Sequence, residues 1–238
     1  MIQAIVFLPL IGALVAGLFG KGLGHRPSEI VTTTLLVVAA VFSWIVFIPF
    51  AFGEADPYTV EVLRWIDVGD LDIRWSLRVD ALTAIMLVVV TTVSSLVHVY
   101  SIGYMAEDPH RARFFAYLSL FTFAMLALVT ADNFVQMFFG WEGVGLASYL
   151  LIGFWYKKPS ANAAAMKAFV VNRVGDFGFA LGIFGAFWLT GAITFEGAFA
   201  ALPGLEGATI RFLGAELDAI TIVCLLLFMG AMGKSAQF

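Results

Sequence analysis

Charged residues, cysteine and histidine are all scarce in this chain. Of its 238 residues, 13% are charged and 61% are hydrophobic, whereas a soluble domain is about 25% charged and about 45–50% apolar. The single cysteine, Cys224, excludes an intramolecular disulfide and a cysteine-based metal cluster. The net charge of −4 provides no basic surface for nucleic acid. The sequence also contains no phosphate-binding glycine loop, haem-ligand pair or metal-ligand cluster.

What the sequence has instead is a series of apolar runs, each about 20 residues long, the length of a membrane-spanning helix. The runs cover residues 2–20, 30–52, 80–104, 113–130, 132–155, 164–190 and 218–238. The first run has no basic region before it and no cleavage site, so we interpret it as a retained helix and not as a signal peptide. The sequence therefore predicts an all-α polytopic membrane protein with about seven transmembrane helices.

Positive charges are distributed unevenly over the connections between these runs. The odd-numbered connections carry seven Lys and Arg residues, whereas the longer even-numbered connections carry four, together with most of the acids. By the positive-inside rule, the amino terminus faces outward and the odd-numbered connections face the cytoplasm.

The outer connections are predicted to have structure of their own. Residues 71–79 alternate apolar and polar, and residues 58–66 are rich in β-formers, so a hairpin over 58–79 is expected, with its turn at residues 68–70. Residues 194–202 are expected to form a short interfacial helix that ends at Pro203-Gly204. Asp80 and Asp132 begin spans and are predicted to be helix N-caps.

Four ionisable residues lie deep inside predicted spans, where a charge costs at least about 2.5–3.5 kcal/mol. They are Glu142, Arg173, Asp176 and Lys234. A rise of about 1.5 Å per residue places the first three near the middle of the bilayer. Gly230 and Gly233 flank Lys234, and a helix broken at these glycines is a device of midplane ion sites.

The spacing of these residues suggests partners for them. Arg173 and Asp176 are three residues apart on one helical face, so they can pair locally, and such a pair could serve packing alone. Glu142 has no basic neighbour in its own helix, and Lys234 is its predicted partner. In a low dielectric, a change in their contact would alter how tightly each holds its proton, which suits proton transfer. A purely structural salt bridge that fixes packing remains the alternative.

Two further residues are weaker candidates for carrying protons. His98, in the third span, titrates near neutrality, but a hydrogen-bonded packing role fits it equally well. Lys167 is expected to open the sixth helix, where it would snorkel or line an inner half-channel. The Gly143-x-Gly145 segment follows no strand, so these glycines indicate close helix packing and not a dinucleotide site.

Several segments together resemble a known family. They are HVYSIGYM (98–105), RFFAYLSLF (113–121), NFVQMFFGWEGVGLASYLLIGFWY (133–156), KAFVVNRVGDFGF (167–179) and GAMGKSAQF (230–238). They are similar to the antiporter-like subunit L family of proton-pumping NADH:quinone oxidoreductase, respiratory complex I, and the resemblance runs along the whole chain. It implies an antiporter-like helical repeat, with residues 1–110 as the amino-terminal helices plus the hairpin and 111–238 as the first part of that repeat. Family members are longer, so the chain is expected to be an amino-terminal part.

The resemblance also implies a function and its residues. Glu142, Lys234 and Asp176, with Arg173 beside it, match the family's motifs and would translocate protons. NADH, FMN, iron–sulfur clusters and quinone would be bound by other subunits, and this chain would hold no cofactor or metal. Its partners would be other membrane-arm subunits, lipids and protons, in the bacterial inner membrane or its mitochondrial counterpart.

Two other functions remain open at this stage. The large subunit of a multi-subunit sodium/proton antiporter resembles this family in the same segments and would need no redox partner. A structural membrane scaffold would use the buried charges only for assembly.

Overall fold

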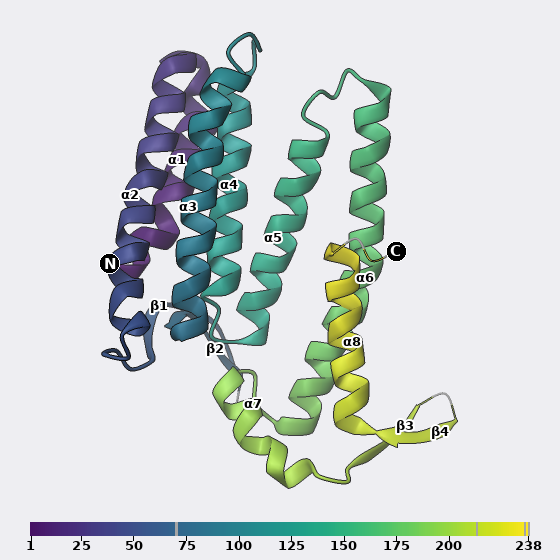
Figure 1. Ribbon diagram of the computed structural model, residues 1–238. Coiled ribbons are helices and arrows are strands. Elements are labelled where there is room, and N and C mark those ends of the chain that lie inside the picture. Colours follow the sequence, from purple (N-terminus) through teal and green to yellow (C-terminus); the bar gives the residue numbers. More distant parts are fainter. Residues whose placement is uncertain (70, 213, 236, 238) are drawn as a thin grey trace.

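The computed structural model describes residues 1–238 except 70, 213, 236 and 238 (Figure 1). Its long helices are α1 (Ile2–Leu23), α2 (His25–Ala51), α3 (Ala81–Tyr104), α4 (Arg111–Val129), α5 (Phe134–Ile152), α6 (Pro159–Thr190) and α8 (Ala219–Lys234). A short helix, α7 (Phe195–Ala201), is followed by the 3-10 turn η1 (Leu202–Leu205). Two antiparallel hairpins complete the described part: β1 (Tyr58–Val68) with β2 (Leu71–Val79), and β3 (Thr209–Phe212) with β4 (Ala215–Asp218).

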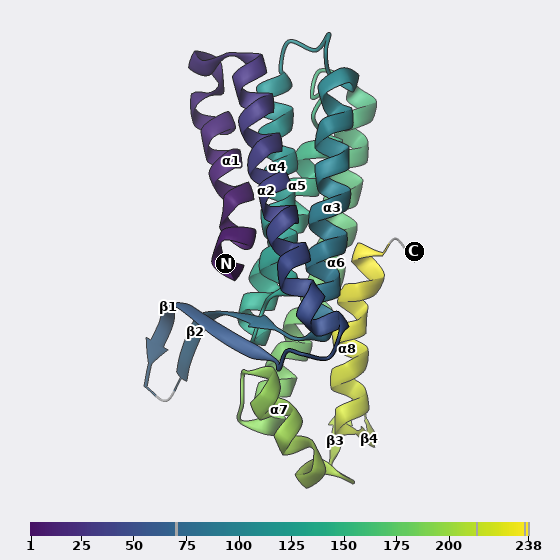
Figure 2. The ribbon, with the colours of Figure 1, turned by 60° about the vertical axis from the view of Figure 1, so that its left-hand side comes forward.

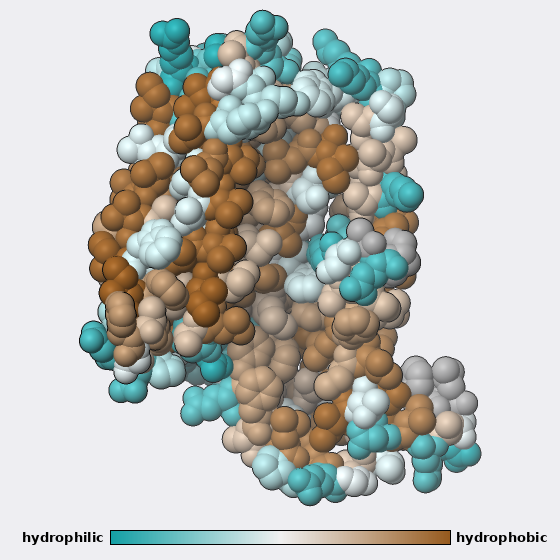
Figure 3. Space-filling model, viewed as in Figure 1, coloured by the Kyte–Doolittle hydropathy of each residue, from teal (hydrophilic) through white to brown (hydrophobic). Residues whose placement is uncertain are grey.

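Six helices, α1 to α6, are long and apolar enough to cross a membrane. The space-filling view agrees, because hydrophobic residues cover most of the sides of the helices and most hydrophilic residues gather at the ends, with a further hydrophilic group at mid-height on the right (Figure 3). The seventh predicted span corresponds to α8, whose 16 residues are fewer than the about 20 that a full span needs. Membrane helices are thus confirmed, whereas the predicted number of seven spans is not.

Helix α8 is continuous from Ala219 to Lys234. The predicted interruption at Gly230 and Gly233 is therefore wrong within the described residues. These glycines instead lie against α6: a Cβ on Gly230 would come 2.7 Å from the Cβ of Phe179, and one on Gly233 would come 3.3 Å from the Cα of Gly175. Their small size serves helix packing, which is a use of glycine in membrane bundles.

Of the two predicted helix N-caps, one is confirmed and the other is wrong. Asp80 caps α3, with the backbone N–H of Thr83 donating to its carboxylate over 2.9 Å, as predicted. Asp132 is not the cap of α5. That helix begins at Phe134, so Asn133 takes the capping position and accepts from the backbone N–H of Gln136 over 2.8 Å.

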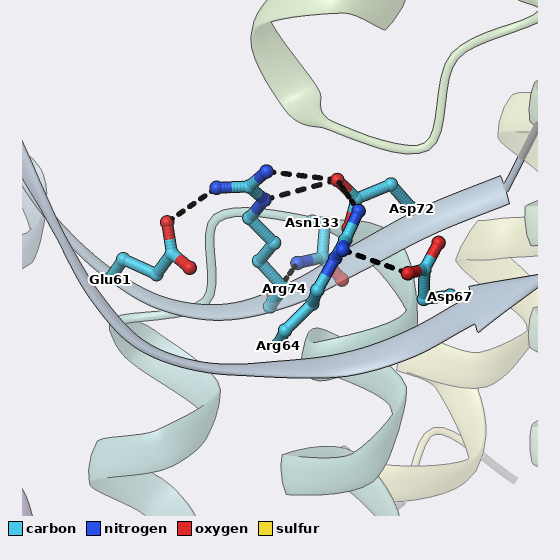
Figure 4. A network of polar contacts seen from close by, with 6 residues as sticks. All are labelled: Glu61, Arg64, Asp67, Asp72, Arg74 and Asn133. Atoms are coloured by element: carbon cyan, nitrogen blue, oxygen red, sulfur yellow. Dashed lines mark hydrogen bonds and ion pairs between the residues drawn. The ribbon is translucent and has the colours of Figure 1, made fainter.

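The predicted hairpin over 58–79 is present, with Tyr58 opposite Val79 and Val68 opposite Leu71. Residue 70 of its expected turn lies outside the described residues. One face carries a network of charged side chains: Glu61, Arg64, Asp67, Asp72 and Arg74 (Figure 4). Hydrogen bonds from Arg64 and Arg74 lower the pKa of the Asp72 carboxyl. The hairpin projects sideways from the helices at the end of the bundle that also holds α7 (Figure 2).

The segment between α4 and α5 fixes the hairpin to the helices. The backbone N–H of Arg78 donates to the carbonyl of Thr130 over 2.9 Å, and the side chain of Asn133 donates to the carbonyl of Arg74 over 2.9 Å. Trp75 packs its ring against Phe139 of α5, with 4.7 Å between the centroids. The hairpin is thereby held against the start of α5.

The outer connection after α6 contains more structure than the sequence predicted. Helix α7 and the η1 turn agree with the short helix expected over 194–202, and the turn includes Pro203 and Gly204. The β3–β4 hairpin was not predicted. Its strands are only four residues each, too short for a clear alternation.

Packing divides the described helices between two hydrophobic cores. The first joins α1 to α4 with the long hairpin and includes Ile5, Val46, Leu77, Leu87 and Leu126. The second joins α5 to α8 and includes Phe134, Phe179, Ala198 and Val223. Helix α4 also packs along α5, so the two groups lie side by side (Figure 1). The division of the chain at residue 110 stays a prediction.

Candidate functional site

The four ionisable residues predicted from sequence line a single cavity of about 520 Å³. Glu142 comes from α5, Arg173 and Asp176 from α6, and Lys234 from the end of α8. Glu142 lies near the midpoint of the 19-residue α5, and Asp176 lies near the midpoint of the 32-residue α6. Since both helices are long enough to span a bilayer, the cavity lies near its middle.

The partners within the cavity differ from those predicted. Arg173 pairs with Glu142, with Nη1 donating to Oε1 over 2.8 Å, and Lys234 Nζ lies 3.7 Å from Asp176 Oδ1. The predicted Glu142–Lys234 contact and the predicted Arg173–Asp176 pair are therefore wrong. Among the described residues, no ion pair of 4.0 Å or less joins Glu142 to Lys234.

The orientation of α6 explains this exchange of partners. Asp176 stands beside the glycines through which α6 packs on α8, so it meets Lys234. Arg173 lies about one turn nearer the start of α6 and reaches α5. Helix α6 thus contributes one charge to each pair, and the charges alternate in sign from Glu142 through Arg173 and Asp176 to Lys234.

The two pairs differ in their exposure. Asp176 is 3% exposed, and its carboxylate also accepts a hydrogen bond of 2.8 Å from the indole N–H of Trp141. The Lys234 side chain is 16% exposed, and its Nζ lies 6.0 Å from the Trp141 ring centroid. In the other pair, the side chain of Arg173 is 52% exposed. The Asp176–Lys234 pair is therefore the more deeply buried of the two.

Glycines leave the room that the charged groups need. A Cβ on Gly145 would collide with Lys234 Nζ, and a Cβ on Gly143 would come 3.0 Å from the Cβ of Ala124 on α4. The prediction that these glycines serve close packing is confirmed. At Gly145 the absent side chain makes space for the ammonium group.

Comparisons with known proteins agree with this arrangement of helices. Residues 65–115 match the family described as the amino terminus of NADH-ubiquinone oxidoreductase (complex I) chain 5, and residues 131–238 match the transmembrane family of NADH:quinone oxidoreductase and Mrp antiporters. The chain belongs to this complex I/Mrp family. The resemblance to subunit L stated from the sequence is thereby confirmed.

Individual family members show how far the similarity extends. NADH-quinone oxidoreductase subunit L of Rhodobacter capsulatus is 57% identical over 100% of this chain and 34% of its own length. NADH-ubiquinone oxidoreductase chain 5 of Triticum aestivum is 53% identical over 98% of this chain and 34% of its own length. The chain therefore spans about a third of the length of these relatives.

A solved structure supports the family fold. The Mrp complex from Dietzia sp. DQ12-45-1b superposes with a TM-score of 0.78 at 19% identity, over 98% of this chain and 23% of the solved chain. At this identity the likeness concerns the fold alone, which is that of the antiporter-like members of the complex I/Mrp family.

His98 does not line the cavity that holds the two ion pairs. It is fully buried between α3 and α4, where Nδ1 lies 2.8 Å from the carbonyl of Ser94 and Nε2 lies 3.1 Å from the hydroxyl of Ser119. Because a carbonyl can only accept, we assign the proton to Nδ1 and the role of acceptor to Nε2. A role for His98 in proton transfer stays a prediction.

Lys167 is exposed and also lies outside the cavity. Helix α6 begins at Pro159, so the prediction that Lys167 opens this helix is wrong. The run of small residues at 161–165 continues the helix upstream of the apolar run on which that prediction rested.

Trp141 is the member of the site that sequence reasoning missed. It lies next to Glu142 in α5, and its indole reaches Asp176 of α6. An aromatic residue in an apolar helix gives no signal of such a contact. Only its position immediately before the single acid of the GWEGVG segment could have suggested it.

Proposed function

We propose that this chain forms part of a proton-translocating membrane-arm subunit of an NADH:quinone oxidoreductase. The observation that carries the proposal is the pair of ion pairs that line one cavity halfway along apolar helices. Buried charges in membrane helices are costly and mark ion or proton pathways. The high identity to subunit L and chain 5 relatives favours a complex I subunit over other members of the family.

The alternating charges suggest how protons move. A carboxylate beside Lys234 favours the protonated amine, and the guanidinium of Arg173 favours the ionised form of Glu142. When a proton arrives at Glu142, Arg173 loses its anionic partner and is free to turn toward Asp176. Asp176 then stabilises the Lys234 ammonium less, and Lys234 releases its proton. The protonation state of Glu142 thus affects that of Lys234 through the two charged residues of α6 and not through direct contact.

In this proposal, other subunits carry out the redox chemistry and start the conformational change. Quinone reduction in other subunits would shift α6 or its surroundings, and this chain would break and form no covalent bonds. NADH, FMN, iron–sulfur clusters and quinone would be held by those subunits. The complex would lie in the bacterial inner membrane or the mitochondrial inner membrane.

The test uses the full-length subunit in the assembled complex, reconstituted in proteoliposomes. With Glu142→Gln or Lys234→Met, we expect NADH-driven proton uptake to fall to the passive leak, while the complex still assembles. Lys157→Gln, at an exposed residue of the α5–α6 connection, is the matched control and should pump normally. Wild-type pumping in both site variants would refute the proposal, whereas loss of assembly alone would support a structural scaffold.

A sodium/proton antiporter is the second candidate. Its support is the match of residues 131–238 to a family that includes Mrp antiporters, together with the fold shared with the Mrp complex. Purification of the native complex distinguishes the two. A preparation with flavin and iron–sulfur absorbance supports the oxidoreductase subunit, and a colourless preparation that exchanges sodium for protons supports the antiporter.

A further inference from the structure

A second cavity, of about 480 Å³, lies where α4 begins and α5 meets α6. It shares no lining residue with the cavity of the ion pairs. Its polar lining comes from Arg113 and Tyr117 of α4, Tyr149 of α5 and Asn162 of α6. Leu150 and Met166 add apolar surface. The cavity thus combines one cation with several hydrogen-bonding groups and an apolar border.

Arg113 is held firmly in this cavity, and the nearby Asp108 carboxylate interacts with its charge electrostatically but does not pair with it directly. Its Nη2 donates to the backbone carbonyl of Phe154 over 3.1 Å, and its guanidinium lies 4.8 Å and 5.1 Å from the ring centroids of Phe154 and Tyr156. Its Nε is buried without a hydrogen-bond partner. Within the described part of the chain, no carboxylate oxygen lies within 4.0 Å of its nitrogens.

These features fit a phosphate group. A guanidinium presents several N–H donors in a planar fork that matches phosphate oxygens, and rings that stack on it orient the fork. The hydroxyls of Tyr117 and Tyr149 can donate further hydrogen bonds. Asn162 is itself fixed, because its side-chain amide donates to the carbonyl of Tyr156 over 2.7 Å.

The surroundings favour a lipid as the source of the phosphate. The cavity lies at the ends of membrane-spanning helices, where head groups are found. Trp155 and Tyr156 are exposed beside it, as is typical of residues at the membrane–water boundary. Basic pockets between membrane helices at this level bind anionic head groups.

We propose that this cavity binds the phosphodiester of an anionic phospholipid, with Arg113 as the principal contact and one acyl chain along Leu150 and Met166. The site uses none of the residues of the ion pairs. It would fix a lipid across the junction of α4, α5 and α6.

The experiment measures binding of phosphatidylglycerol to the detergent-solubilised full-length complex by native mass spectrometry. Phosphatidylcholine and inorganic phosphate serve as the competing probes. We expect wild-type protein to prefer phosphatidylglycerol, and Arg113→Gln to weaken that binding about tenfold, the effect of losing a charge-assisted hydrogen bond. Lys157→Gln removes an exposed cation of the α5–α6 connection, next to Tyr156, and should retain the wild-type affinity.

Arg113 also donates a hydrogen bond to the carbonyl of Phe154, so Arg113→Gln could disturb folding. A second variant therefore separates lost lipid binding from a folding defect. Tyr117→Phe removes only a hydroxyl and leaves that contact intact, and it should weaken phosphatidylglycerol binding by a smaller factor. Unchanged affinity in Tyr117→Phe, together with either unchanged affinity or failed assembly in Arg113→Gln, would overturn the proposal. So would displacement of the lipid by millimolar inorganic phosphate, because the site would then take free phosphate.

Discussion

Asp176 is the residue on which the charged site depends most. It is the most buried of the four ionisable residues, and it contacts both Trp141 of α5 and Lys234 of α8. A buried charge that loses its partner is more costly than the pair itself is stabilising. The energetic consequences of changing Asp176 should therefore exceed those of changing Glu142, whose partner Arg173 is half exposed.

At this scale we predict that Asp176→Asn lowers the stability of the full-length complex in detergent by about 3 kcal/mol or more. The amide oxygen can still accept from Trp141, so the loss reflects the uncompensated ammonium of Lys234. Asp176→Asn combined with Lys234→Met should cost less than the sum of the two single changes, because the residues interact. Thermal unfolding of the four proteins measures this cycle.

The more exposed pair provides the control for that cycle. Glu142→Gln should cost less than Asp176→Asn, because both side chains of the Glu142–Arg173 pair are more exposed than those of the Asp176–Lys234 pair. Equal losses for Asp176→Asn and Glu142→Gln, or strict additivity in the double variant, would show that the burial of Asp176 does not set its importance.

At the scale of elements, glycines decide how closely α6 approaches α8. A Cβ on Gly175 would come 3.1 Å from the carbonyl oxygen of Met229 and 3.2 Å from the Cα of Gly233. Backbone atoms cannot move aside as a flexible side chain can. The same contact sets the position of Lys234 opposite Asp176, so packing and site geometry depend on one interface.

We predict that Gly175→Ala destabilises the protein by about 1–3 kcal/mol, the usual effect of overpacking. It should also reduce proton pumping, because α8 must move away from Asp176. Gly103→Ala is the matched control in α3, where a Cβ would meet no atom within 4 Å. There the change should be neutral or stabilising by up to about 1 kcal/mol. Melting temperatures and proteoliposome assays of both variants test this prediction.

For the whole molecule, the distribution of charge predicts the orientation in the membrane. The α1–α2, α3–α4 and α5–α6 connections lie at one end of the bundle, and the β1–β2 hairpin, α7 and the β3–β4 hairpin lie at the other (Figure 1). The first end carries the excess of Lys and Arg. By the positive-inside rule it faces the cytoplasm.

Labelling of introduced thiols tests this orientation in a background in which Cys224 is replaced by serine. In intact cells, a membrane-impermeant maleimide should label the thiol introduced by Asp67→Cys in the hairpin. The thiol introduced by Lys157→Cys should react only after the membrane is permeabilised. The reverse pattern would contradict the predicted topology.

The sequence alone determined the features that depend on local chemistry. Hydrophobic runs predicted the membrane helices, although seven were expected and six are long enough to span, alternation predicted the β1–β2 hairpin, and the helical rise placed Glu142 and Asp176 near the middle of the bilayer. Each of these follows from residues close in sequence, because a membrane helix satisfies its backbone hydrogen bonds within itself and the two strands of a hairpin pair with each other. Depth within the apolar runs singled out the four charged residues, and the resemblance of the motifs to subunit L of complex I implied a function for them.

Only the tertiary structure decided which of these charges meet. The pairing depends on how α6 is rotated and where it contacts α8, and glycines far apart in the sequence set both. Spacing within α6 suggested a pair between Arg173 and Asp176, but their neighbours on α5 and α8 offer each a partner of opposite charge. The contact of Trp141 with Asp176 and the cavity around Arg113 likewise arise from contacts between segments, which no local pattern encodes.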